Sequence, residues 1–62
     1  MIVSEKMALS IRRKKAENIL TISQLANLLD IHRTTLSRLL LGNCKVNKST
    51  YEKLVNWLVE DL

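Results

Sequence analysis

Residues 32–42, HRTTLSRLLLG, contain two guanidinium groups among several hydroxyl-bearing side chains. In a helix, Arg33 and Ser37 lie about one turn apart on one face. Thr34 and Arg38 lie one turn apart beside them, and three leucines of the same segment occupy the opposite side. Guanidinium groups can bond guanine edges, and hydroxyl groups bond bases or phosphates. This face therefore predicts hydrogen bonding to nucleic acid, and the alternative is an ordinary solvated helix surface.

Polar residues on either side of this segment extend the candidate surface. Gln24 is expected to contact a phosphate, although a helix-capping role explains it equally well. His32 is expected to cap the following helix or to contact a phosphate. Asn43, Lys45 and Lys48 follow the segment and are expected to bind the nucleic-acid backbone.

The chain lacks the residues that a metal site or a hydrolytic active site would need. The chain has one histidine and one cysteine, whereas a zinc site needs three or four ligands. A hydrolytic triad has no support in so short a chain, so we expect no enzyme, no metal and no cofactor. Cys44 is interpreted as an incidental loop thiol, and residues 12–15, RRKK, as a solvated helix surface whose charges point in different directions.

The length and the charge of the chain limit its class. Sixty-two residues allow one domain, and a composition that is 47% hydrophobic argues against disorder. The net charge is +4, and the basic excess lies within residues 1–46. A basic face on a small domain suggests a polyanionic partner, although extra lysines can simply aid solubility.

The sequence contains no targeting or membrane-spanning signal. No apolar run approaches the roughly 20 residues of a transmembrane helix. The first residues place apolar side chains before the charges, the reverse of a signal peptide. The single cysteine cannot form an internal disulfide. We therefore expect a cytoplasmic protein with no membrane partner.

Hydrophobic periodicity predicts four helices and no strand, since MIV at the start is too short to assign. The first helix should cover residues 4–18, with Ser4 as its N-cap. The second should begin at Thr21, where TISQ has the spacing of a capping box. The third should cover residues 33–41 and end at Gly42. The fourth should begin near Asn47 or Ser49.

The apolar positions of these helices predict the core. Its expected members are Met7, Ile11, Leu25, Ala26, Leu29, Ile31, Leu36, Leu39, Leu54, Val55 and Leu58. Trp57 is placed at the core edge, or alternatively in a partner interface with Val59 and Leu62, because tryptophan is favoured at such interfaces.

Two short helices joined by about four residues, DIHR, with a polar outer face on the second, form a helix-turn-helix pattern. The pattern resembles the lambda-repressor-like (XRE-type) family of phage Cro and repressor proteins and their bacterial relatives. The resemblance covers about residues 8–58, with its core at residues 21–42. The matching positions are Thr21, Gln24, Leu25, Ala26, Leu29, Ile31, Thr35, Leu36, Ser37, Arg38 and Gly42.

The resemblance implies an all-α, compact four-helix domain over residues 1–62, without a clear fifth helix. Family members usually have glycine in the turn, where this chain has Asp30, and Ser or Thr as the following cap, where it has His32. The implied function is transcription regulation by a phage-type or mobile-element-type repressor that inserts its third helix into the major groove of operator DNA. The alternative is an antirepressor that docks on a phage repressor and blocks its DNA binding. A homodimer and a phage repressor protein remain open as protein partners.

Overall fold

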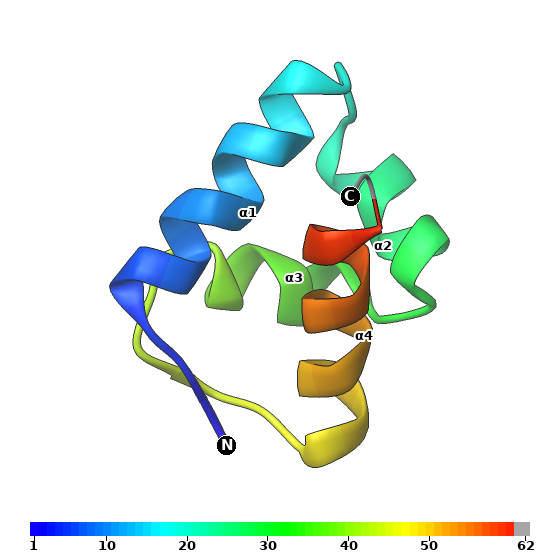
Figure 1. Ribbon diagram of the computed structural model, residues 1–62. Helices are drawn as coiled ribbons and strands as arrows, with labels where there is room; N and C mark the ends of the chain where they lie inside the picture. Colours follow the sequence, from blue (N-terminus) through cyan, green and yellow to red (C-terminus); the bar gives the residue numbers. More distant parts are fainter. Residues whose placement is uncertain (61–62) are drawn as a thin grey trace.

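Four helices and a small strand pair make up the computed structural model, which describes residues 1–60. The elements in chain order are β1 (Ile2–Val3), α1 (Glu5–Glu17), α2 (Ile22–Leu29), α3 (Arg33–Leu39), β2 (Cys44–Lys45) and α4 (Lys48–Val59). Figure 1 shows α3 crossing behind α4, with α1 along one side and α2 along the other. The expected all-α four-helix class is confirmed.

Side-chain caps explain where three of the helices begin. Ser4 accepts a hydrogen bond from the backbone N–H of Met7 at the start of α1. Thr21 Oγ1 accepts from the Gln24 N–H at 3.1 Å, and Gln24 Oε1 accepts from the Thr21 N–H at 2.9 Å. Asn47, the first of the two expected starts, caps α4 by accepting from the Thr50 N–H at 2.8 Å. These caps satisfy donors that a helix leaves unpaired at its first turn.

The end of α3 differs from the expectation. The helix ends at Leu39, two residues before the predicted Leu41, because the chain tightens there into a turn. The N–H of Leu41 bonds to the Arg38 carbonyl, and that of Gly42 to the Leu39 carbonyl. Gly42 has a φ of +90°, and a Cβ there would lie 3.2 Å from Glu5 Cα. Gly42 therefore allows both the left-handed turn and the close approach of α1.

A short antiparallel strand pair was not predicted. Ile2 lies opposite Lys45, and Val3 lies opposite Cys44. The pairing continues at Val46, whose N–H donates to the Met1 carbonyl at 2.8 Å and whose carbonyl accepts from the Met1 ammonium group at 2.9 Å. A strand of two residues is too short to show an alternation of apolar and polar side chains. Each of these segments becomes a strand only by pairing with the other, some 40 residues away in the chain.

The core lies where the four helices and the strand pair meet. Its buried side chains are Val3, Ala8, Ile11, Leu25, Ala26, Leu29, Leu36, Leu39, Leu40, Val46, Leu54 and Trp57. Of the expected members, Met7, Ile31 and Leu58 are partly buried against this cluster. The placement of Val55 in the core is wrong, because its side chain is 36% exposed on the outer side of α4.

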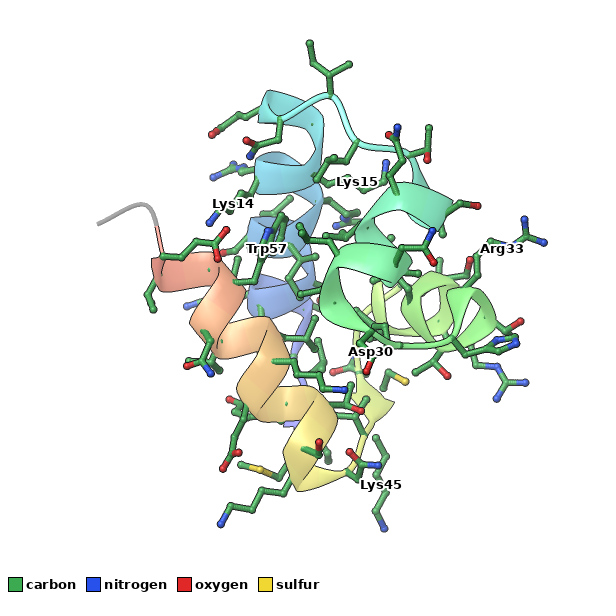
Figure 2. All side chains as sticks on the ribbon, turned by 90° about the vertical axis from the view of Figure 1, so that its right-hand side faces the viewer. Lys14, Lys15, Asp30, Arg33, Lys45 and Trp57 are labelled. Atoms are coloured by element: carbon green, nitrogen blue, oxygen red, sulfur yellow. The ribbon has the colours of Figure 1, made fainter. Side chains whose placement is uncertain are left out.

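Trp57 packs inward, between α4 and α1 (Figure 2). It is only 4% exposed, so it lies inside the core rather than at the expected core edge, and little of its surface is left for the alternative partner interface. Trp57 and Val55 lie on the same turn of α4, but Trp57 is buried whereas Val55 is exposed. Within residues 1–60, no helix has the length and apolar character needed to cross a membrane.

Candidate nucleic-acid interface

The outer face of α3 carries the predicted hydrogen-bonding residues. Leu36 and Leu39 are fully buried, and they fix the helix against the core. The four residues on the other side are all exposed, namely Arg33, Thr34, Ser37 and Arg38. Figure 2 shows Arg33 standing clear of the ribbon on the side away from Trp57. The short amphipathic helix thus presents two guanidinium groups to the solvent on a rigid base.

The turn between α2 and α3 is tightly bonded. Asp30 adopts the left-handed conformation, with φ 56° and ψ 48°. Its N–H donates to the Asn27 carbonyl at 3.2 Å, and the N–H of Ile31 donates to the Ala26 carbonyl at 3.0 Å. Both bonds satisfy carbonyl groups at the end of α2. Because three residues separate the two helices, these bonds restrict the direction in which α3 leaves the turn.

His32 is the N-cap of α3. Its Nδ1 atom accepts a hydrogen bond from the Thr34 N–H at 3.1 Å, which confirms the capping interpretation. An accepting Nδ1 carries no proton, so in the neutral ring the proton resides on Nε2. The ring itself is exposed, and Nε2 is available as a donor toward an anion at the start of α3.

The remaining predicted contact residues are exposed, but most of them have partners within the chain. Gln24 uses its Oε1 atom in the capping box of α2. Asn43 Nδ2 donates to Glu5 Oε1 at 3.3 Å, and Lys48 lies 3.9 Å from Glu52 in the same helix. Lys45 projects from β2 near the lower end of the molecule in Figure 2.

Residues 12–15 do not form one basic patch. Arg12 and Arg13 are exposed, whereas Lys14 and Lys15 are partly buried. Lys14 lies over the Trp57 ring, so part of this basic run has a structural contact. The interpretation of the run as charges that point in different directions agrees with this division.

Two features of the surface were missed by sequence reasoning. Leu41 was assigned to the third helix, but it lies after α3 and is 81% exposed, beside Leu9, which is 40% exposed. Lys53 of α4 donates a hydrogen bond to the Asp30 carbonyl at 3.1 Å. No sequence signal links Lys53 to the turn, because the two residues meet only through the packing of α4 against α2.

Of the three residues predicted as an alternative protein interface, only one is both described and exposed. Val59 is 48% exposed at the end of α4, whereas Trp57 is buried. Leu62, the third member of the set, lies outside the described residues. Within residues 1–60, no group of three or more His, Cys, Asp or Glu residues is placed to hold a metal ion. Cys44 is partly buried on β2.

The exposed face of α3 can present hydrogen-bond donors to a ligand, and Lys45 and Lys48 add positive charge after the helix. Comparison of the chain with protein-family models, with curated proteins and with solved structures gives no match. A functional assignment therefore depends on the residues and contacts described above.

Proposed function

We propose that this chain is a small cytoplasmic transcriptional regulator of the lambda-repressor-like helix-turn-helix type, which binds double-stranded operator DNA with α3 in the major groove. The observation that carries the proposal is the division of α3 into two faces. Leu36 and Leu39 are completely buried, while the residues of the arginine-bearing face are exposed. Buried leucines hold the helix against the core, and the exposed donors match the acceptors of base edges.

The length of α3 suits a limited readout. Seven residues at the rise of an α-helix span about 10 Å, which corresponds to roughly three base pairs. Arg33 and Arg38 act as the base-reading residues in this proposal, with Thr34 and Ser37 beside them. Lys45 and Lys48 supply sequence-independent attraction to phosphates.

A second copy completes the proposed mode of binding. One module of this size buries about 600–1,000 Å² of protein surface on DNA, which limits its specificity. Two copies on half-sites about one helical turn apart double the number of bases read. A homodimer on a two-fold symmetric operator is therefore the proposed assembly.

Selection from a pool of random DNA duplexes tests the proposal. The wild-type protein should enrich a short motif, and fluorescence anisotropy should show tighter binding to it than to random DNA. Arg33→Ala should lose about 1–3 kcal/mol on the selected site and relax the preference at one base pair. Arg13→Ala is the charge-matched control, because Arg13 is exposed on α1, outside the proposed surface.

Two results would overturn the regulator. One is a pool that fails to enrich any sequence, and the other is an equal loss of affinity from Arg33→Ala and Arg13→Ala on selected and random DNA alike.

A second candidate function is favoured by two exposed leucines, Leu9 on α1 and Leu41 after the end of α3. They line an open hollow together with Glu5, Lys6 and Arg12, and apolar side chains beside charges of both signs suit a protein partner better than a phosphate backbone. In that case the chain is an antirepressor that docks on a phage repressor. The wild-type protein should then bind a repressor domain tightly and bind DNA only non-specifically and in a salt-sensitive way.

A further inference from the structure

We propose that Lys53 is a positioning residue for α3: from α4 it holds the left-handed turn at Asp30 and thereby sets the orientation in which α3 meets DNA. The inference rests on the proposed DNA-binding function, since it assigns a residue that acts on the same surface without touching the ligand. Lys53 lies on α4, outside the exposed face of α3 and the segment that follows it.

The turn has a conformation that a residue with a side chain adopts reluctantly. Asp30 has φ 56° and ψ 48°, a region that glycine enters freely and that aspartate tolerates better than most residues. Its N–H bonds back to α2, and its carbonyl oxygen accepts a hydrogen bond from Lys53 of α4. One of the hydrogen bonds at this turn therefore comes from outside the helix-turn-helix unit.

Lys53 supplies that bond. Its Nζ atom donates to the Asp30 carbonyl at 3.1 Å and lies 3.9 Å from Asp30 Oδ2. The Asp30 side chain is 97% exposed, so its ion pair with Lys53 contributes little by itself. The bond to the carbonyl is the more specific contact, because it restrains the peptide plane that follows Asp30. Figure 2 shows Asp30 at the bend between α2 and α3, on the side facing α4.

The base of this contact is rigid. The neighbours of Lys53 on α4 include Leu54, which is fully buried, and Trp57, which is 4% exposed. The helix therefore cannot shift without disturbing the core. A lysine anchored on such a helix can restrain a turn whose own residues are exposed or only partly buried.

The restraint matters because base readout depends on precise placement. A rotation about the backbone of Asp30 swings the start of α3, where Arg33 lies, while Leu36 and Leu39 keep the rest of the helix near the core. Loss of the restraint should therefore impair recognition of the correct sequence more than general attraction to phosphates.

Lys53→Met tests this role, because methionine keeps the apolar stem and removes the donor. In this variant the affinity for the selected site should fall about 3- to 10-fold relative to the affinity for random DNA. Lys53→Arg should retain most of the wild-type preference, because arginine keeps a charged donor. The matched control is Lys6→Met, which removes one exposed charge from α1 and should lower binding to both DNAs equally.

Amide hydrogen exchange of the free protein measures the turn independently of DNA. In Lys53→Met the amide hydrogen of Ile31, which bonds to Ala26, should exchange faster relative to the amide hydrogen of buried Ile11 in α1. A general loss of stability would accelerate both. If Lys53→Met is unfolded at the assay temperature, Lys53→Gln takes its place.

The outcomes separate the two claims. If the wild-type protein selects no DNA, the proposed function fails, and the exchange ratio of Ile31 to Ile11 still tests whether Lys53 holds the turn. An unchanged exchange ratio overturns the role of Lys53, whatever the DNA result. Faster exchange of the Ile31 amide hydrogen with an unchanged preference for the selected site also overturns the proposed role, because the turn would then not govern recognition.

Discussion

The ammonium group of Lys14 lies 4.8 Å from the centre of the Trp57 ring, and it also donates a hydrogen bond to the Trp57 carbonyl oxygen. One side chain of α1 thus contacts both the ring and the backbone of the last turn of α4. The contact with the ring is a cation–π interaction, and the contact with the carbonyl adds a charged donor to an acceptor near the C-terminal end of α4, which also accepts from the Glu60 N–H at 3.5 Å. The positive charge also suits the negative end of the α4 dipole.

Lys14→Met should lower the free energy of unfolding by about 1–2 kcal/mol, since it removes a partly desolvated cation–π contact and a helix-end hydrogen bond together. Urea denaturation followed by Trp57 fluorescence measures the change. Lys6→Met, on the exposed side of the same helix, should change it by less than about 0.5 kcal/mol. Equal effects of the two substitutions would show that the contact with Trp57 adds no stability.

Leu36→Ala should destabilise the protein by about 2–4 kcal/mol, because the fully buried side chain leaves a cavity between α3 and the core. So small a domain has little stability to spare, and a large fall in melting temperature follows. Val55→Ala, at an exposed position on α4, is the comparison and should alter the melting temperature little. An unchanged melting temperature in Leu36→Ala would contradict the placement of α3.

Lys45→Ala should weaken binding to every DNA sequence by a similar factor, because an exposed lysine on β2 acts through phosphate charge alone. The slope of the logarithm of affinity against the logarithm of salt concentration should fall by about one unit. Titrations at several salt concentrations, on the selected site and on random DNA, provide the measurement. A loss confined to the selected site would instead place Lys45 among the base-reading residues.

Val59→Ser should weaken self-association without unfolding the monomer, because Val59 is 48% exposed at the end of α4. Sedimentation at micromolar concentration, with and without the selected DNA, detects the change. Leu28→Ser removes an exposed apolar side chain from α2 and serves as the control. Trp57 is unsuitable for this test, because its truncation would disrupt the core. A wild-type protein that stays monomeric on every DNA tested argues for the antirepressor alternative.

Local chemistry explains why much of this fold was predictable. The capping residues Ser4 and Thr21 act on amides three residues away, so their effect is visible in a short stretch of sequence. The leucines of α3 recur at helical spacing, which indicates the buried side and, by exclusion, the exposed side that carries the candidate site. A tight turn at Asp30 was likewise indicated, because the two helices are too close for a flexible linker.

Local patterns were enough to predict the four helices, the starts of the first three and the two faces of α3, because these features depend on residues within a few positions of each other. The pairing of Ile2 with Lys45, the inward packing of Trp57 and the bond from Lys53 to Asp30 emerged only from the folded chain. The strand pair exists only because the two segments meet. In α4, apolar residues occupy a wide arc of the helix, so the sequence did not show whether the side with Val55 or the side with Trp57 is buried. These contacts join residues far apart in the chain, and their geometry is set by how the helices pack, which no local pattern encodes.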